Sequence, residues 1–370
     1  MQKTIIARRP ILTREQEVSA YEIDFKDSIK KSIQKESVDG TAKEINDNIE
    51  FAQRKKIAEG KRIFIKFIND FLSKELIDLL SKENLGVKVS GKFLDNSNNR
   101  ELIRELSRDG AKIMLTDLAP DSIDLDLIED ADIVQFNFHE HPIEKQKDFI
   151  KRVGFGLNGD IKFLAKGIDT HADFKKAKEI NYDFFSGIFF TKPDITPEQK
   201  IPGYKINYLN FLKELNKEDL DFKQLEKIIK QDMAMSTSLL RTINTAYYGY
   251  DIASIKQAST LLGIKGLKRW SLIFLAEGLR NEKPDILFVN TLIRAKFAEK
   301  LAVDFDLSQE GDSLFTMGMF SMLDAFIDRS LEDLLKEIPL VDKIKNALLE
   351  NEGTFGDILE LVVSHEVVNW

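Results

Sequence analysis

The hydrophobic positions in the first half of the chain follow two alternating patterns. Short runs of β-branched or alternating apolar residues predict strands, and segments with apolar residues three and four apart predict helices. Residues 4–7 and 18–25, joined by a polar turn, predict a β-hairpin. Further strands are predicted over 62–67, 87–90, 112–115, 133–138, 161–165 and 184–190, and helices over 41–53, 71–80, 100–108, 125–129, 142–152 and 172–179. Strands alternating with helices indicate parallel βαβ units, and about seven or eight strands favour an α/β barrel of the TIM type.

Proline and charge mark a boundary in the middle of the chain. Pro193, Pro197 and Pro202 lie within a charged stretch, which is typical of a linker. Beyond residue 204 the apolar positions keep a helical period and β-branched runs are few, so the second half is predicted to be all-α. The predicted parts are a barrel over residues 1–194, a linker over 195–202 and a helical domain over 203–370.

Residues 239–270 carry the clearest local signals of the helical half. Apolar residues over 239–247 share one helical face, and Asn244 interrupts that face with a side chain able to bond a neighbouring backbone group. Ser254 is expected to cap a second helix, and Gly263 to supply the left-handed position where that helix ends. A third helix follows, and such short amphipathic helices need other helices to cover them.

Composition narrows the class of protein. A chain of 370 residues with 43% hydrophobic and 31% charged residues suggests two domains with sizeable cores. A net charge of −8 argues against broad nucleic-acid binding. The absence of cysteine excludes disulfides and thiolate metal sites and fits a reducing compartment. Neither a long uninterrupted apolar run nor a signal-peptide pattern is present, so we expect a cytoplasmic protein without membrane contact.

The helical half resembles the HDOD domain. The pattern comprises Gln231-Asp232, the run LLRTIN that ends at Asn244, the run that ends LLG at Gly263, and Arg269-Trp270. HDOD domains are similar in helical arrangement to HD-type phosphohydrolases but lack their metal-binding His-Asp dyad, and no histidine in this half precedes an aspartate. The resemblance therefore implies an HD-like helical bundle in which Asp232, Asn244, Gly263 and Trp270 are structural signature residues.

The first half resembles the EAL domain of two-domain EAL-plus-HDOD proteins. The resemblance rests on ARRPILTREQEVSAYEIDFK at residues 7–26, in which Tyr21-Glu22-Ile23 stands at the family's Glu-Ala-Leu position, and on FFSGIFFTKP at 184–193. Active EAL domains hydrolyse cyclic di-GMP with two divalent metal ions, which are held by carboxylates at the carboxyl ends of barrel strands and lower the pKa of the attacking water.

Carried over position by position, the EAL pattern is mostly replaced. Glu22 matches the first metal ligand, Lys66 stands in place of an asparagine ligand, and Gln135 replaces the lysine assigned to water activation. The other matched positions are Lys26, Ser90, Thr116, Asp117, Asn137, Gly167 and Ser186, of which Asp117 keeps the second of a pair of aspartates. The resemblance thus implies a barrel whose vestigial site positions include Glu22, Lys66, Asp117 and Gln135, with no catalytic residue, metal or cofactor.

Lys66 suggests a more specific hypothesis. Glu22 and Lys66 are expected on adjacent strands that point into the barrel mouth, where the ammonium group could replace the charge of a metal ion in a partly buried ion pair. The alternative is that Lys66 extends into solvent.

Other candidate sites have ordinary interpretations. His139 and His141 could share one face of an extended segment, but without an evident third ligand they are better interpreted as surface or interdomain histidines. The G-x-G string at 154–156 has no phosphate-loop lysine and is interpreted as a turn. The basic cluster around Lys265 and Arg269 is interpreted as a solvated face rather than a nucleic-acid site.

These observations lead to the expectation of a non-enzymatic signal-transduction scaffold. Its HDOD domain would bind other signalling proteins of unknown identity. Whether the protein forms a homodimer is left open. The alternative is a receptor that binds cyclic di-GMP without cutting it, and a third hypothesis is residual enzyme activity.

Overall fold

A computed structural model of the protein describes residues 5–26, 60–66, 85–121, 126, 128–156, 161–195, 203–217, 219–244, 252, 254–279 and 283–366. The chain forms two compact units, the first ending at Phe189 and the second beginning at Phe190. Each unit is described by itself. Most of the predicted linker, and the helices predicted over 41–53 and 71–80, lie outside the described residues.

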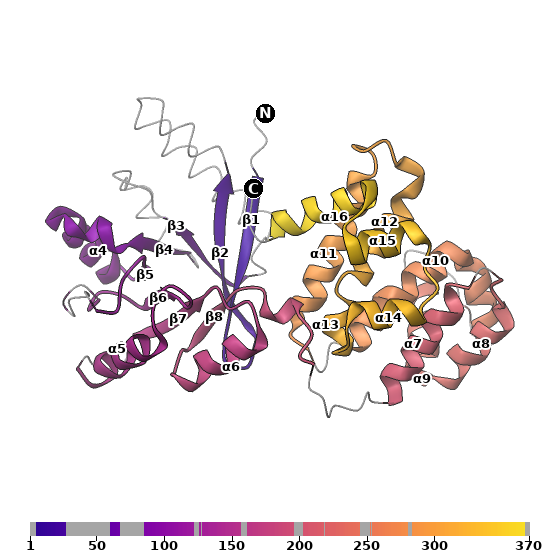
Figure 1. Ribbon diagram of the computed structural model, residues 1–370, viewed down its shortest axis with the longest axis horizontal. Coiled ribbons are helices and arrows are strands. Elements are labelled where there is room, and N and C mark those ends of the chain that lie inside the picture. Colours follow the sequence, from indigo (N-terminus) through magenta and orange to yellow (C-terminus); the bar gives the residue numbers. More distant parts are fainter. Residues whose placement is uncertain are drawn as a thin grey trace. The chain divides into compact units, whose positions relative to one another are not determined.

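The first unit is a closed barrel (Figure 1). Its strands, within the described residues, are β1 (Ile5–Leu12), β2 (Val18–Lys26), β3 (Arg62–Lys66), β4 (Leu85–Ser90), β5 (Lys112–Thr116), β6 (Ile133–Asn137), β7 (Lys162–Lys166) and β8 (Phe184–Ser186). β1 runs antiparallel to both β2 and β8, and every other neighbouring pair is parallel. The predicted hairpin and the predicted β/α barrel are both confirmed.

Two strand ends differ from the prediction by four residues or more. β1 continues beyond residue 7 to Leu12, because Ile11 and Leu12 are buried in the barrel and pairing with β2 extends with them. The strand predicted over 184–190 stops at Ser186. Gly187 follows it and lies so close to the backbone of Ile168 that an added Cβ would be 2.1 Å from the Ile168 carbonyl oxygen.

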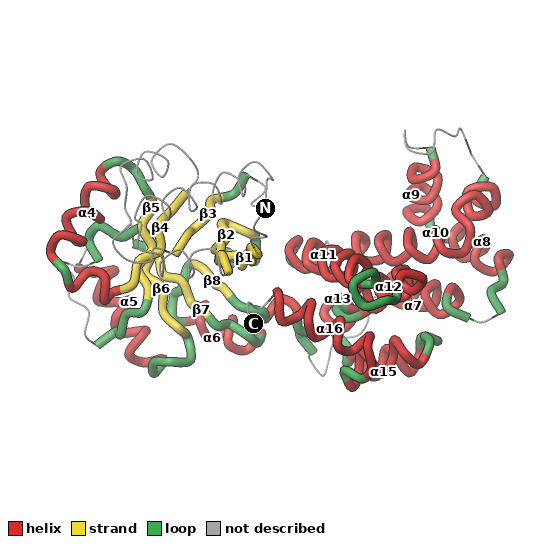
Figure 2. The backbone as a smooth tube through the Cα atoms, turned by 90° about the horizontal axis from the view of Figure 1, so that it is seen from above, coloured by secondary structure: helices red, strands yellow, loops and turns green. Residues whose placement is uncertain are grey.

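Helices lie outside the ring of strands, as Figure 2 shows. They are α4 (Ser97–Arg108), α5 (Ile143–Gly156) and α6 (His171–Glu179). Asn96 and Thr170 cap α4 and α6, since each side chain accepts a hydrogen bond from a backbone N–H of the first turn. These helices confirm the predicted βα alternation. α4 begins three residues and α6 one residue before the predicted start, and α5 ends four residues after the predicted end. The prediction of a turn over 154–156 is wrong, because these residues form the last turn of α5.

Apolar side chains from successive strands fill the barrel interior. They form one buried cluster made of Ile11, Ala20, Phe64, Met114, Ile133 and Leu164, against which Phe184 packs. Gly86 on β4 makes room for the ring of Phe64, because a Cβ at this glycine would lie 2.4 Å from the ring carbon Cε1. We call this cluster the apolar layer, and it forms the floor on which the candidate site lies.

The described part of the second unit consists of helices and the loops between them, without a strand, which confirms the predicted all-α half (Figure 1). Its main helices are α7 (Gly203–Leu215), α8 (Phe222–Gln231), α9 (Met233–Ile243), α10 (Ile255–Gly278), α11 (Asp285–Leu301), α12 (Gly311–Phe320), α13 (Leu323–Ile327), α14 (Leu331–Glu337), α15 (Asp342–Glu350) and α16 (Gly353–Glu366). None of the helices in the described part of the chain is long and apolar enough to cross a membrane.

The helix predicted over 239–247 is α9, and its ends were predicted incorrectly. It begins earlier, at Met233, where the Asp232 side chain accepts a hydrogen bond from the Met235 N–H. It ends at Ile243, because the Asn244 amide accepts a hydrogen bond from the Ile252 N–H at 2.9 Å and donates one to the Ile252 carbonyl at 2.7 Å. This reciprocal pair uses the side chain of Asn244 where the described helix ends.

Gly263 and Trp270 also have clear structural roles. Gly263 has a φ of 65° and kinks α10, so the expected left-handed helix end is confirmed there. Trp270 is buried and stacks on Phe274, with ring centroids 5.4 Å apart, while its edge meets Phe211. The aromatic contacts join α10 to α7.

Candidate functional site

A ring of polar side chains lies above the apolar layer, on the side where the parallel strands end. In a strand, residues two apart point to the same face, so each inward apolar residue is followed two positions later by another inward residue. In this barrel the second inward residue of each such pair is polar. The pairs are Ala20 and Glu22, Gly86 and Lys88, Met114 and Thr116, Ile133 and Gln135, Leu164 and Lys166, and Phe184 and Ser186.

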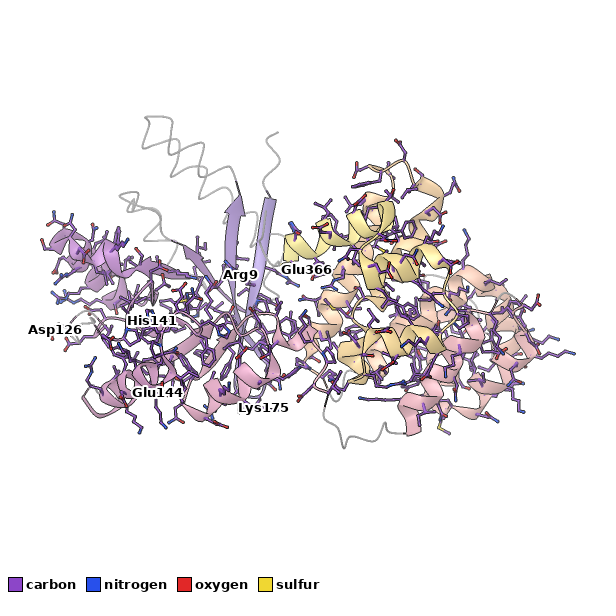
Figure 3. The ribbon with its side chains drawn as sticks, viewed as in Figure 1. Arg9, Asp126, His141, Glu144, Lys175 and Glu366 are labelled. Carbon is purple, nitrogen blue, oxygen red and sulfur yellow. The ribbon has the colours of Figure 1, made fainter. Side chains whose placement is uncertain are left out.

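We call Glu22, Lys88, Thr116, Gln135, Lys166 and Ser186 the polar layer. All of them except Lys166 are buried. The antiparallel strand β1 adds Arg9, which is labelled in Figure 3. Arg9 lies opposite Glu22 in the β1–β2 register. The carboxyl ends of the strands are where β/α barrels bind their ligands, so this layer is the candidate functional site.

Glu22 is the electrostatic centre of the polar layer. Its Oε1 accepts a hydrogen bond from Lys88 Nζ at 2.9 Å, and its Oε2 lies 3.8 Å from Arg9 Nε. Burial alone would raise the pKa of this carboxyl. The charges of Lys88, Arg9 and Lys166 outweigh burial and hold its pKa below the ordinary value, so Glu22 is ionised in the folded protein.

Two buried acceptors of the layer have no hydrogen-bond donor among the described residues. These atoms are Oε2 of Glu22, whose residue is 2% exposed, and Oε1 of Gln135, whose residue is 4% exposed. A buried acceptor without a donor costs free energy of about 1–3 kcal/mol. The layer is therefore suited to a bound group that brings hydrogen-bond donors with it.

Three of the four predicted EAL site positions can be placed by their side chains. Glu22 and Gln135 belong to the polar layer, whereas Asp117 is exposed just after β5, with a φ of 56°, and accepts a hydrogen bond from Thr116. Lys66 ends β3 beside β2, so the two strands are adjacent as predicted. Its side chain lies outside the described part of the structure, and the predicted pair with Glu22 stays a prediction.

Lys88 is the residue that the sequence reasoning missed. It occupies the position next to Lys66 in the β3–β4 register, and it is the lysine that pairs with Glu22. A signal was present in the sequence. Lys88 lies between Val87 and Val89 in a strand, and it shares a face with Ser90, which had been assigned to the mouth.

The described residues do not fit a pair of divalent metal ions. Such a site needs several carboxylates around each ion, and no group of three or more His, Asp or Glu side chains comes together in the described part of the chain. Glu22 is already held by an ammonium group, and Asp117 is exposed. We therefore derive no chemical step through a metal from these residues.

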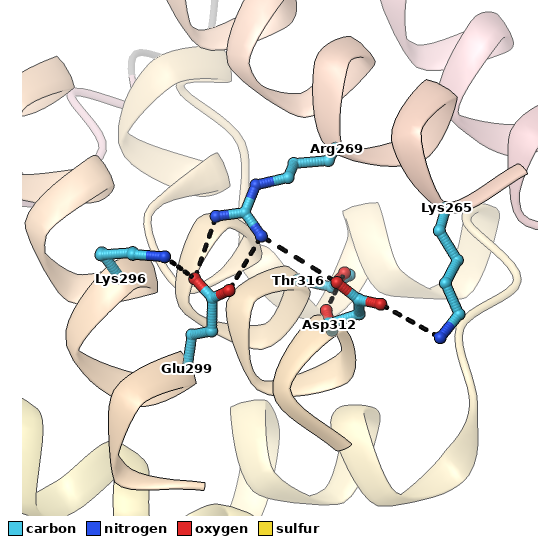
Figure 4. A network of polar contacts seen from close by, with 6 residues as sticks. All are labelled: Lys265, Arg269, Lys296, Glu299, Asp312 and Thr316. Carbon is cyan, nitrogen blue, oxygen red and sulfur yellow. Dashed lines mark hydrogen bonds and ion pairs between the residues drawn. The ribbon is translucent and has the colours of Figure 1, made fainter. Parts of the chain in front are cut away.

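The basic cluster of the second unit is mostly neutralised. Arg269 on α10 forms a two-pronged ion pair with Glu299 of α11, at 3.0 and 2.9 Å (Figure 4). Its guanidinium lies over the ring of Phe315, 4.0 Å from the centroid. Asp312 lies within 4.0 Å of both Arg269 and Lys265. The pairs tie α10 to α11 and α12, which supports the interpretation of a solvated structural face.

Replacing Arg269 by methionine is expected to destabilise the helical unit by about 1 kcal/mol, because a bidentate pair on a partly exposed surface contributes more than a single surface salt bridge. Urea unfolding of the single variants Arg269→Met and Glu299→Gln and of the double variant gives their coupling energy. Additive effects of the two substitutions would show that this pair does not connect the helices.

Comparison with known proteins identifies the helical unit. Residues 201–345 match the family model for the HDOD domain. The helical unit contains an HDOD domain. The organisation expected from the sequence, an EAL-type barrel followed by an HDOD domain, is thereby confirmed, together with the fold class of both parts.

Two relatives align over the whole chain. The cyclic di-GMP phosphodiesterase CdgJ of Vibrio cholerae serotype O1 is 28% identical over 376 residues, covering 100% of this chain and 86% of CdgJ. The uncharacterized protein YuxH of Bacillus subtilis strain 168 is 28% identical over 381 residues, covering 100% of this chain and 92% of YuxH. Among solved structures, the FimX EAL domain from Pseudomonas aeruginosa bound to c-di-GMP aligns with 50% of this chain and 89% of its own, at 11% identity and a TM-score of 0.39.

The full-length similarity to CdgJ corrects the expected function. The sequence reasoning predicted a non-enzymatic scaffold, with a non-hydrolysing receptor as the alternative, because individual EAL positions carry other residues. That expectation is wrong, since a relative named as a phosphodiesterase aligns with every part of this chain, barrel and HDOD domain included. The residues at a few positions of the EAL pattern do not identify every side chain that lies in the barrel mouth.

Proposed function

We propose that this protein is a cyclic di-GMP phosphodiesterase whose barrel mouth binds the substrate. The observation that carries the proposal is the 28% identity to CdgJ over the full chain. Hydrolysis of one phosphodiester bond adds the oxygen of water to phosphorus and releases the ribose oxygen as a hydroxyl, so that the cyclic dinucleotide becomes a linear one. One proton of water ends on the leaving oxygen, and the other is lost to solvent.

The charges of the barrel mouth support an anionic substrate. Arg9, Lys88 and Lys166 surround the carboxylate of Glu22, so the described cations at this point outnumber the acids. A phosphodiester carries one negative charge on two oxygens, and cations in a recessed, poorly solvated site hold such a group more strongly than the same cations in water. We assign these cations to holding and orienting the phosphodiester.

Glu22 is assigned to positioning rather than to proton transfer. Its lowered pKa makes it a weak base, and its hydrogen bond fixes the ammonium of Lys88 at the level of the polar layer. The amide of Gln135, in the same layer, offers an uncharged polar contact.

Turnover of cyclic di-GMP by the full-length protein tests the proposal. The protein is incubated with cyclic di-GMP and Mg²⁺ or Mn²⁺, and the nucleotides are separated by anion-exchange chromatography. We expect the linear dinucleotide to accumulate in proportion to protein concentration. Substrate that stays intact at every protein concentration would refute the enzymatic assignment.

We propose further that the protein acts in the cytoplasm and that its HDOD domain contacts other signalling proteins or a second copy of the chain. The exposed apolar side chains of Leu261 and Ile264, on either side of the kink at Gly263, support a contact surface there. Sedimentation velocity of the full chain and of the double variant Leu261→Ser/Ile264→Ser checks for a dimer that depends on this surface.

A further inference from the structure

We propose that Lys88 takes the position of a divalent cation in the barrel mouth, so that cyclic di-GMP is bound through its phosphodiester without any metal ion. The inference rests on the proposed function, because it assumes the same substrate and the same mouth. It concerns binding, whereas the proposed function also includes cleavage.

The position of Lys88 is fixed by its strand and by the residues around it. Lys88 is 7% exposed, and its ammonium donates to Glu22 Oε1 at 2.9 Å. Two residues earlier on the same face, Gly86 leaves its space to the buried ring of Phe64. The lysine therefore cannot fold down into the apolar layer, and its charge stays at the level of the barrel mouth.

A divalent ion at Glu22 would meet strong repulsion. To reach Oε1 it would have to displace the ammonium of Lys88, and the guanidinium of Arg9 already lies 3.8 Å from Oε2. Lys166 adds a third positive charge that acts on the same carboxylate. Like charges at such distances in a poorly solvated site repel each other by several times the thermal energy. The arrangement thus replaces a bound cation with side-chain cations.

The unsatisfied atoms indicate which part of the ligand lies next to the phosphate. Glu22 Oε2 and Gln135 Oε1 are buried acceptors that lack donors among the described side chains. A ribose hydroxyl beside a phosphodiester is a donor, and a phosphate oxygen is an acceptor for Lys88 and Lys166. The polar layer is therefore complementary to a ribonucleotide phosphodiester, which carries both groups side by side.

Calorimetric titration of cyclic di-GMP into the full-length protein tests the inference. The titration is done once with EDTA and once with Mg²⁺, and we expect saturable binding of equal affinity in both. Lys88→Met is expected to raise Kd by about 10- to 100-fold, which is the usual effect of losing one hydrogen bond from a charged donor. Lys88→Arg keeps the charge and is expected to retain part of the affinity.

A matched control distinguishes the loss of a charge in the barrel mouth from the loss of a charge elsewhere on the barrel. Lys112, at the amino end of β5, is an exposed barrel lysine paired with Asp132, so Lys112→Met removes a similar ion pair away from the mouth and should leave Kd unchanged. Lys88→Met leaves the buried carboxylate of Glu22 without the ammonium group that pairs with it. The double variant Glu22→Gln/Lys88→Met is therefore prepared as well. It removes both charges, is expected to fold, and should bind as weakly as the single variant.

Each outcome decides between the two claims. Binding that requires Mg²⁺ and vanishes in EDTA would overturn the inference and leave the proposed function intact. Unchanged affinity in the folded double variant would overturn it too, because Lys88 would then not contact the ligand. The absence of binding and turnover with EDTA, Mg²⁺ and Mn²⁺ alike would overturn the proposed function itself, and the inference with it.

Discussion

Replacing Glu22 by alanine is expected to destabilise the barrel by about 3–5 kcal/mol, the usual result of removing one partner from a buried ion pair. The substitution leaves the ammonium of Lys88, 7% exposed, next to Arg9 without the carboxylate that neutralises both. Unfolding in urea, followed by circular dichroism and by protection of barrel amides from hydrogen exchange, measures the loss. The variant Lys112→Met breaks the exposed pair with Asp132 and should change stability by less than about 1 kcal/mol.

The pH dependence of the same pair has a defined sign. The folded state lowers the pKa of Glu22 from its ordinary value of 4.5, so the unfolded state binds more protons in the acid range. The contribution of the pair is fully present above about pH 4.5 and is lost as the pH falls through the lower folded pKa. The Glu22→Ala variant should lack this part of the acid destabilisation. An identical acid profile in both proteins would show that Glu22 is not held as an ion.

Changing Gly318 to alanine is expected to destabilise the HDOD unit by about 2–3 kcal/mol, because this glycine lets two helices touch through their backbones. A Cβ at Gly318 of α12 would lie 2.4 Å from the Cα of Ala295 and 2.8 Å from its backbone nitrogen on α11. Backbone atoms cannot move aside as a flexible side chain does, so α11 and α12 must separate and lose their packing.

Fluorescence of Trp270 reports on this unit, since the indole is buried among its helices, and the Trp370→Phe background removes the other tryptophan of the chain. Gly311→Ala is the matched control, because Gly311 begins the same helix and the nearest atom to its added Cβ, Cγ of Glu299, lies 3.6 Å away. That control should be neutral or slightly stabilising. Equal midpoints for Gly318→Ala and the parent would refute the close contact.

The sequence carried enough information for the architecture, since the period of apolar residues identifies strands and helices directly. The resemblance to the EAL pattern placed Glu22 and Gln135 in the barrel mouth, and both belong to the polar layer. The pairing partner of Glu22 could not be found in this way. Lys66 and Lys88 occupy adjacent positions on neighbouring strands, and periodicity shows which face a lysine takes but not which carboxylate it reaches.

The ends of helices could not be predicted from the period of apolar residues either. The apolar face over 239–247 predicted one helix, yet the hydrogen bonds between Asn244 and Ile252 end it at Ile243. These bonds join residues eight apart, a separation that no periodic pattern of apolar residues contains. The prediction of function failed for a similar reason, because it compared single positions of the EAL pattern, whereas the alignment with the phosphodiesterase CdgJ covers the whole chain.

Single-turnover conversion of cyclic di-GMP by an excess of the full-length protein tests directly whether this protein hydrolyses cyclic di-GMP in its barrel mouth. With ligand fully bound, the reaction is stopped at intervals and the nucleotides are separated by chromatography, for the parent, Lys88→Met and Lys112→Met proteins. We expect the parent and Lys112→Met to convert the ring to the linear dinucleotide, and Lys88→Met to do so far more slowly at the same ligand concentration. If cyclic di-GMP stays intact while calorimetry shows that it is bound, the protein is not a phosphodiesterase.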